Sequence, residues 1–543
     1  MNKTIDIRLS PEVADDPAAI IAGISDKTGI EVEDVRYYQI VRRSIDARGR
    51  RVVVQLRIRV ADQPLPPPGE LKSKLQPVSD APEVMIVGAG PAGYFAALEL
   101  IELGSRPVIF ERGQDVRSRR KALRAIQQLG IVNPHSNYCF GEGGAGTYSD
   151  GKLYTRSHKR GNIEKVLRWF VEHGAHPDIL VDAHPHIGSN KLPRIVSSLR
   201  DTIESFGGTV HFDAHVTDLV IESGRLLGIR WGNGQFYAGN ALILASGHSA
   251  RDVVEMLRSN SLALEFKPFA LGVRIEHPQA LIDEIQYKQS PRSSFLPASS
   301  YALSCQVGAK GVFSFCMCPG GLVVPAATSP GEIVVNGMSL SRRDSAYANA
   351  GTVVGIDEKD LTVSVAQNPL AGVELQAQVE RDMFASGDGS QKAPAQRLVD
   401  FTAGKLSQDL PKSSYIPGLF TAPLHRLLPD FVYQHLRQAI PQFEQKMRGY
   451  LTRDAVVIGT ESRTSSPIRI PRHADSLMHP DLVGLFPCGE GAGYAGGIVS
   501  AAMDGQRVAR AVVRHLQGLP STSVQRYNTA SNTQAYVRRD NSI

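Results

Sequence analysis

The sequence has little cysteine and no long hydrophobic run. Five cysteines, an odd number, are scattered over 543 residues, so a disulfide framework is not expected and a reducing compartment is favoured. No apolar stretch approaches the roughly 18 residues that span a membrane. The N-terminal stretch MNKTIDIRLSPEVADDP also lacks the apolar segment of a secretory signal. These absences predict a cytoplasmic protein with no membrane partner.

A dense run of basic residues is missing as well. The net charge of +6 is spread along the chain, which does not by itself indicate a nucleic acid partner. Five arginines gather around one expected hairpin turn: Arg42, Arg43, Arg48, Arg50 and Arg51. They could contact an anion or RNA, although a solvated hairpin is the simpler interpretation.

The strongest motif is the stretch VMIVGAGPAGYFAALELIELGSRPVIFERG, residues 84–113. Residues 84–87 form an apolar run typical of a strand, 94–103 have helical spacing, and 108–110 resume strand character. Glycines between the first strand and the helix complete G-x-G-x-x-G. The glycine pattern alone would be weak, but with a strand, a helix and a second strand around it, it predicts a dinucleotide-binding unit.

Each glycine of this motif has a physical role. Gly88 permits the tight turn, Gly90 lets the backbone approach a pyrophosphate, and Gly93 allows the helix to pack closely on the strand. The helix N-terminus offers free N–H groups to the phosphates. Glu111 lies near the spacing of about 20 residues expected for an acid that accepts hydrogen bonds from an adenosine ribose.

The order of motifs predicts an α/β protein of several domains. A small α+β domain is expected over 1–75, with strands near 4–9, 35–44 and 51–60 and a helix near 17–28. A proline-rich extended connector, ending with 76–82, leads into a Rossmann-like dinucleotide-binding domain over 83–261 and 453–518. An α+β insertion over 262–452 interrupts that domain, and 519–543 form a loose polar tail.

Within these domains the sequence predicts further elements. Residues 208–247 contain a parallel strand, a crossing β-meander and a buried strand that ends in A-S-G. In the insertion, strands are expected at 269–276, 301–307, 311–318, 321–326 and 332–338, and helices at 373–385, 395–406 and 429–451. Ile498 begins a helix after the G-L-F-P-C-G-E segment.

Taken together, these motifs resemble FAD-binding oxidoreductases of the glutathione-reductase structural class. Within that class the chain is similar to a bacterial family described as FAD-dependent dehydrogenases or NAD(P)/FAD-dependent oxidoreductases. The strings that carry the similarity are SIDAR, FGEGGAGTYSDGKL, GHSARD, FCMCPGG, NGMS and GTESRTSSPIR. They extend over nearly the whole chain but say little about a substrate.

The resemblance implies FAD as the cofactor and a set of residues that hold it. At the adenosine half these are Gly88, Ala89, Gly90, Pro91, Ala92, Gly93, Glu111, Arg112 and, through its backbone, Val216. At the ribityl and flavin half they are Gly247, Gly489, Glu490, Gly497 and Ile498. Gly144 and Gly146, in a second glycine-rich stretch at 137–156, would let a loop press against a ring or a phosphate, although a surface loop explains them equally well.

The source of electrons is left open by the sequence. There is no second strand-G-x-G-x-x-G-helix unit for a nicotinamide cofactor and no C-x-x-x-x-C pair beside the fingerprint. Reduction would therefore come from the substrate or from NAD(P)H that binds transiently.

Cys316 and Cys318, in F-C-M-C-P-G-G, are the most unusual feature outside the flavin motifs. Alternation along a strand places both side chains on one face. A buried structural pair, a redox pair and a metal site are all compatible with this spacing, but no histidine and cysteine set has zinc spacing, so no metal is predicted.

Candidate residues for orienting a substrate are Arg274, Arg343, Arg463 and His248. We expect Arg463 to clamp an anionic group through its guanidinium fork, or else to form a salt bridge that fixes the insertion. His248 follows the A-S-G strand end and could act as an acid or base, or fill a loop.

The function predicted from these features is hydride transfer between FAD and a small organic substrate. A flavin-dependent RNA-modifying protein and a non-catalytic flavin-binding regulator are the alternatives. The oligomeric state is not predicted.

Overall fold

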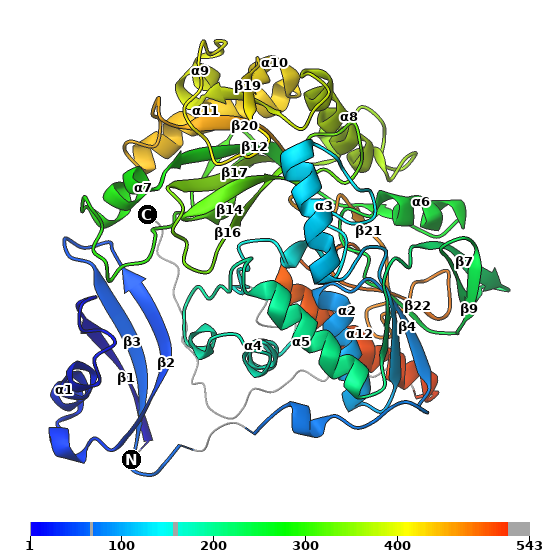
Figure 1. Cartoon of the computed structure of the whole chain (residues 1–543), viewed down its shortest axis with the longest axis horizontal. Helices are drawn as coiled ribbons and strands as arrows, with labels where there is room; N and C mark the ends of the chain where they lie inside the picture. The colour runs from blue at the N-terminus through cyan, green and yellow to red at the C-terminus, as the bar shows by residue number, and fades with distance from the viewer. Residues whose placement is uncertain (1, 66–68, 156–160, 520–543) are drawn as a thin grey trace.

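The computed structural model describes residues 2–65, 69–155 and 161–519 (Figure 1). Of the predicted tail over 519–543, residues 520–543 lie outside the described residues. No helix in the part of the chain that the structure describes is long and apolar enough to cross a membrane.

A five-stranded parallel sheet forms the centre of the dinucleotide-binding domain. Its order is β22 (Leu485–Pro487), β10 (Leu242–Leu244), β4 (Glu83–Val87), β5 (Arg106–Phe110) and β6 (Thr209–His211). All neighbouring strands run parallel. Because β22 comes from the far end of the chain, the sheet is completed only after the insertion. The predicted α/β fold with a parallel sheet is confirmed.

The residues of each central strand alternate between two layers. Val84 and Ile86 of β4 pack into a core with α2 (Pro91–Glu102), α4 (Ile163–Glu172), α5 (Leu192–Ser205) and α12 (Ile498–Leu516). Met85 and Val87 pack instead with the meander β7 (Val216–Glu222), β8 (Arg225–Trp231) and β9 (Gln235–Ala238). A strand buried on both faces has a continuous apolar run, which is why the fingerprint strand shows no alternation.

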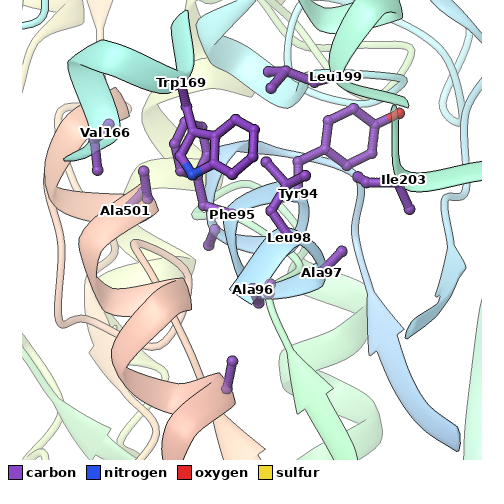
Figure 2. Packing of buried hydrophobic residues seen from close by; sticks show 14 of the residues in the cluster. Tyr94, Phe95, Ala96, Ala97, Leu98, Val166, Trp169, Leu199, Ile203 and Ala501 are labelled. Carbon is purple, nitrogen blue, oxygen red and sulfur yellow. The ribbon is translucent and has the colours of Figure 1, made fainter. Parts of the chain in front are cut away.

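Close contact between α2 and the strand end depends on Gly93. A Cβ atom at this position would lie 1.9 Å from the carbonyl oxygen of Gly88, so no other residue fits without moving the helix. Around α2, Figure 2 shows Phe95, Trp169 of α4 and Ala501 of α12 in one apolar cluster. The helical layer is therefore built from segments far apart in the sequence.

The insertion is organised around a seven-stranded sheet. Its order is β13 (Ser304–Val307), β14 (Lys310–Cys318), β17 (Tyr347–Ile356), β12 (Phe269–Pro278), β20 (Val456–Glu461), β18 (Ala393–Arg397) and β19 (Leu419–Thr421). The helices around it are α7 (Gln279–Tyr287), α8 (Ala371–Ala385), α9 (Leu398–Ala403), α10 (Leu424–Leu427) and α11 (Asp430–Lys446). Shorter pairs are β15 (Gly321–Pro325) with β16 (Val335–Ser339) and β11 (Glu265–Phe266) with β21 (Ile468–Arg469).

Three sequence predictions differ from this sheet. The helix expected at 395–406 is the end of β18 followed by the short α9. β17, which was not predicted, is rich in alanine and glycine and almost wholly buried between β14 and β12, so its packing rather than its residue types makes it a strand. β20 pairs with β12 and β18. The insertion sheet therefore extends past the boundary expected at 452, because the chain adds β20 to this sheet before it re-enters the dinucleotide-binding domain.

The N-terminal segment forms a three-stranded sheet, β1 (Asn2–Leu9), β3 (Val53–Ala61) and β2 (Tyr37–Asp46), with α1 (Pro17–Thr28) packed against it. The predicted helix bounds are confirmed, since the Asp16 side chain caps the first turn and Gly29 ends the helix with a φ of 74°. The outer edge of β2 is covered, because Arg43 exchanges backbone hydrogen bonds with Val181 and Ala183.

The connector is not extended throughout. Leu71, Leu75 and Val78 are buried in the same core as the fingerprint strand, and Glu172 accepts the backbone N–H of Leu71 at 2.8 Å. These apolar side chains dock on the dinucleotide-binding domain, so the small domain ends at β3 rather than at residue 75.

We expect Trp169→Ala to destabilise the protein by about 3–5 kcal/mol, because it opens a cavity at a side chain that is 1% exposed. The matched control is Leu129→Ala at the end of α3 (Val116–Leu129), where the side chain is 71% exposed. Urea unfolding followed by far-ultraviolet circular dichroism measures both. A midpoint shift no larger than that of the control would contradict the packing described here.

Candidate functional site

A cavity of about 740 Å³ lies at the carboxyl ends of the central strands. Its wall includes Val87 at the end of β4, Phe110 at the end of β5 and Ala245 just after β10. Phe315 and Asn336 of the insertion contribute to the same wall. In open α/β sheets this crevice is the usual ligand position, and the volume is within the range of about 300–1,000 Å³ typical of ligand pockets.

The structure brings most of the predicted site residues into this cavity. They are Gly88, Gly90, Pro91, Ala92, Glu111, Arg112, Gly144, Gly146, Val216, Gly247, His248, Arg463, Glu490, Gly497 and Ile498. Ala89, Gly93 and Gly489 do not line it. They shape the wall from behind, Gly93 by its contact with Gly88 and Gly489 by donating its N–H to Asp504 at 2.8 Å.

Two helix N-termini face the cavity. α2 begins after Gly90 and α12 after Gly497, and neither helix has a side-chain cap. Both glycines line the cavity. The first N–H groups of a helix carry a partial positive charge, so the two termini together can bind an anionic ligand such as a pyrophosphate.

The cavity wall keeps room for a large flat ligand. A Cβ atom built at Gly247, Gly496 or Gly497 meets no atom within 4 Å, although all three residues line the cavity. A side chain at any of them would occupy cavity space. The open glycine cradle, the uncapped helices and the acid after β5 fit a dinucleotide such as FAD.

Glu111 is engaged by the protein itself. Its carboxylate accepts the N–H groups of Ala89 at 2.9 Å, Gly113 at 2.9 Å and Gly141 at 2.8 Å. A carboxylate offers about four lone-pair sites, so roughly one remains for a ribose hydroxyl. The predicted ribose acid is therefore also the residue that joins the fingerprint turn to the second glycine-rich stretch.

The neighbouring Arg112 lies at the same end of the cavity. Its guanidinium pairs with Asp252 of α6 (Arg251–Ser259) at 2.8 Å and lies 4.2 Å from the ring centroid of Phe140. Asp252 also contacts His215 at 2.6 Å. Burial raises the pKa of Asp252, but the hydrogen bond from His215 and the charge of Arg112 outweigh it, and the net pKa is lowered. Arg112 is thus held rigidly beside the position expected for adenine.

Comparison with known proteins is consistent with this geometry. The family model described as "FAD-dependent protein, C-terminal domain-like" matches residues 268–464, and a domain of unknown function, DUF8436, matches residues 1–61. An uncharacterized protein of Clostridium beijerinckii is 38% identical over 521 residues, which cover 92% of this chain and 96% of that protein.

The chain belongs to the FAD-dependent protein family.

Solved structures that resemble this FAD-dependent protein are distant in sequence. A triple mutant of the flavin-dependent brominase Bmp2 has 11% identity and a TM-score of 0.35, over 81% of this chain and 82% of that one. Glycine oxidase from Geobacillus kaustophilus has 13% identity and a TM-score of 0.32, over 83% of this chain and 99% of that one. At these scores the likeness carries no inference about reaction or substrate.

In this FAD-dependent protein, Arg463 does not have the free guanidinium fork that a substrate clamp requires. Its Nε and Nη2 donate to Glu380 at 3.0 and 2.9 Å, and Nη2 also contacts Glu332 at 2.9 Å. Arg251 of α6 pairs with the same two glutamates. These four residues, called the ion-pair cluster below, fasten the insertion to the dinucleotide-binding domain. The clamp prediction is wrong for this reason, and the salt-bridge alternative describes the site.

The two glutamates of the ion-pair cluster differ. Burial raises the pKa of Glu380, but the charges of Arg463 and Arg251 outweigh it and lower that pKa to about 2. Burial and the neighbouring Glu380 raise the pKa of Glu332 despite the two arginines. Arg274 is likewise committed to the protein, because it is fully buried and pairs with Glu461 at 2.7 Å. Neither guanidinium is available to a substrate.

His248 lies in the cavity wall and is oriented by Arg463. Its Nε2 is 3.0 Å from the backbone oxygen of Arg463. Since a carbonyl oxygen only accepts, Nε2 carries the proton, and in the neutral ring Nδ1 has the lone pair. The geometry leaves His248 able to accept a proton through Nδ1.

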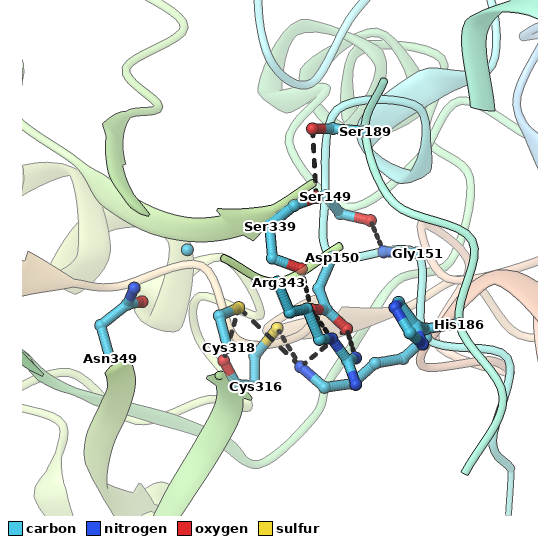
Figure 3. Close-up of polar contacts among 12 residues, drawn as sticks. Ser149, Asp150, Gly151, His186, Ser189, Cys316, Cys318, Ser339, Arg343 and Asn349 are labelled. Carbon is cyan, nitrogen blue, oxygen red and sulfur yellow. Dashed lines mark hydrogen bonds and ion pairs between the residues drawn. The ribbon is translucent and has the colours of Figure 1, made fainter. Parts of the chain in front are cut away.

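Cys316 lines the cavity, Cys318 is buried behind it, and both lie beside Lys152. The Lys152 amine is 3.7 Å from the sulfur of Cys316 and 3.9 Å from that of Cys318. Figure 3 shows both sulfurs next to Asp150 and Arg343, which form a salt bridge. Among the described residues, no group of three or more His, Cys, Asp and Glu side chains could hold a metal ion.

Lys152 was missed by the sequence prediction. It follows the S-D-G turn of the second glycine-rich stretch, so a lysine inside a loop expected at the cofactor was the available signal. Its proximity to the two cysteines depends on the insertion folding back over this loop, which no local pattern indicates. Arg343, a predicted substrate residue, pairs with Asp150 instead of pointing freely into the cavity.

We expect Arg463→Gln to lower the free energy of unfolding by about 3–5 kcal/mol, because it leaves buried carboxylates uncompensated. The control is Arg258→Gln, whose exposed pair with Glu255 is worth at most about 1 kcal/mol. Chemical denaturation of both variants tests this. If Arg463→Gln were as stable as the control and lost only substrate binding, the clamp role would be restored.

Proposed function

We propose that the protein is an FAD-dependent oxidoreductase, a dehydrogenase or reductase that transfers hydride between FAD and a small organic substrate. The observation that carries the proposal is that several elements line the same cavity. They are the fingerprint turn, two uncapped helix N-termini and a wall from the insertion. Bound FAD would supply the two-electron chemistry, and the protein would supply binding and orientation.

The residues of the cavity suggest how the cofactor lies. Glu111, Arg112 and Val216 would bind the adenosine half, since they line the end of the cavity beside β5 and the meander. The start of α2 would face the pyrophosphate. Glu490 and the start of α12 would face the ribityl chain and the flavin ring, with Gly489 held in place by Asp504.

The substrate would enter on the insertion side. Lys152, Tyr154 and Asn336 line this part of the cavity, and the Lys152 side chain is 37% exposed. One accessible amine among polar and aromatic groups favours a small anionic or conjugated substrate. His248, whose Nε2 donates to the Arg463 backbone oxygen, would hold or move a proton through Nδ1. NAD(P)H that binds transiently remains a candidate reductant.

The arrangement of the N-terminal hairpin does not support the RNA-modifying alternative. Of the arginines around the N-terminal hairpin, Arg43 pairs with Asp15, Asp178 and Asp182, and Arg48 pairs with Asp46. Carboxylates of the chain already neutralise these two charges, so the hairpin is a weaker phosphate-binding surface than its sequence suggests.

We expect the purified protein to bind FAD and Gly496→Val to weaken that binding about tenfold or more, which corresponds to a loss of about 1.4 kcal/mol. Gly496 lines the cavity and has open space at its Cβ position, so a valine side chain there would occupy room that the ligand needs. Gly69→Val is the control, since Gly69 is exposed and has open space at its Cβ position. Visible flavin absorbance after equilibrium dialysis gives the affinity of each variant for FAD. A wild-type protein that stays colourless with added FAD would refute the proposal.

Catalysis is tested separately from binding. We expect NADH, NADPH or a member of a panel of small organic acids to bleach the bound flavin under anaerobic stopped-flow conditions. A flavin that binds tightly but is reduced by none of them would favour the non-catalytic regulator.

A further inference from the structure

We propose that Cys316 and Cys318 form a redox-active pair that exchanges two electrons with the FAD bound in the cavity. The inference rests on the proposed function, because it needs FAD at this site. It goes beyond that function by assigning a second electron-carrying group to the protein.

The position of the pair is the first argument. Cys316 lines the cavity, while Cys318 behind it is fully buried. The wall that contains Cys316 also contains Gly497 and Ile498, where the start of α12 would face the flavin. One thiol is therefore accessible from the cavity, and its partner is shielded from solvent.

The backbone of β14 is specialised at this point. A bulge falls between Phe315 and Cys318, since three steps along β14 oppose two along β17. Cys316 has a φ of 45°, an uncommon conformation for a residue other than glycine. The bulge ends the simple strand alternation that the sequence predicted. Both sulfurs lie within 4 Å of the Lys152 amine, at 3.7 and 3.9 Å, and the Cys318 thiol donates to the backbone oxygen of Cys316 at 3.3 Å. Strained backbone of this kind concentrates at functional sites.

The charges around the pair favour one thiolate and one thiol. The hydrogen bond from Cys318 lowers the pKa of Cys316 most, and the nearby Lys152 amine and Arg274 guanidinium lower it further. Burial and the Asp150 carboxylate oppose them, but the net pKa is lowered. Donation of that hydrogen bond and burial together raise the pKa of Cys318. A thiolate is the reactive form of cysteine, so the accessible member of the pair is also the nucleophilic one.

Two other cysteines show what an ordinary structural thiol looks like in this chain. Burial raises the pKa of Cys488, which lies under the strand end at β22, and of Cys305 in β13. Neither has a cysteine neighbour two residues away. Packing alone therefore does not account for the environment of Cys316.

The electron exchange balances without any further reactant. The Cys316 thiolate and the Cys318 thiol form one Sγ–Sγ bond and release two electrons and the Cys318 proton. Bound FAD would accept these two electrons and one proton. In the reverse direction the Sγ–Sγ bond takes two electrons and one proton back and breaks, and the pair is again a thiolate and a thiol.

The first test uses the wild-type full-length chain and needs no cofactor. The protein is equilibrated across a dithiothreitol redox buffer, alkylated and digested. We expect the peptide that carries residues 316–318 to lose the mass of two hydrogen atoms at the oxidising end and to be fully alkylated at the reducing end. A peptide that is alkylated at both cysteines under every condition, or one linked to Cys139, would overturn the pair.

The second test counts electrons in the FAD-loaded protein by anaerobic dithionite titration. We expect the oxidised wild type and the control Cys305→Ser to take up two electron pairs for each flavin, and Cys316→Ser or Cys318→Ser to take up one. If the wild type takes up only one pair, the redox pair is refuted while the flavoprotein stands. A protein that binds no FAD would instead refute the proposed function, and this inference with it.

A substitution of Lys152 tests independently whether its charge stabilises the Cys316 thiolate. We expect Lys152→Gln to move the pH profile of Cys316 alkylation to higher pH, because loss of the amine raises the pKa of the Cys316 thiol. At pH values below the Cys316 pKa of both the wild type and the variant, alkylation should slow roughly tenfold for each unit by which the pKa rises. Lys191→Gln, on the exposed surface before α5, is the control. An unchanged profile in Lys152→Gln would contradict the electrostatic activation on which the pair depends.

Discussion

The carboxylate of Glu111 is the interaction on which the cavity depends. It accepts backbone N–H groups from three separate segments, at Ala89, Gly113 and Gly141. The side chain is only 4% exposed, so these donors would be left unpaired without it, at a cost of about 1–3 kcal/mol each. One acid thus fixes the fingerprint turn and the second glycine-rich stretch relative to each other before any ligand arrives.

The second constraint is the join between the two large domains. In the ion-pair cluster, Glu332, Glu380 and Arg463 are nearly excluded from solvent, while Arg251 is partly exposed. Buried ion pairs keep the two domains in a fixed arrangement, because separating one pair would leave a buried charge without its partner. The join therefore holds the insertion, and with it β14 and Cys316, against the cavity that the start of α12 also lines. A cavity built at this junction can combine cofactor binding from one domain with reactive groups from the other.

Environment, more than residue type, decides the roles of the polar groups. Arg274, Arg343 and Arg463 each suit an anionic substrate by chemistry, yet each is committed to a carboxylate of the protein. Lys152 also lies near a carboxylate, 3.6 Å from Asp150, but its side chain is 37% exposed and lines the cavity, so a ligand can still reach it. The same contrast separates Cys316 from Cys305 and Cys488. Whether a charged or nucleophilic side chain can act depends on which partners have already satisfied it.

Local pattern was enough to predict the fingerprint unit, the α/β class and the split of the parallel sheet, because these depend on periodicity and on glycines whose spacing has a steric cause. The bounds of α1 could be predicted too, since its capping residues adjoin the helix. Three features could be known only from the folded chain: β17 is a strand, residues 71–78 dock on the core, and Arg463 belongs to the ion-pair cluster. It alone brought Lys152 to Cys316. These features depend on contacts between residues far apart in the chain, and no local pattern records which distant group will lie beside a given side chain.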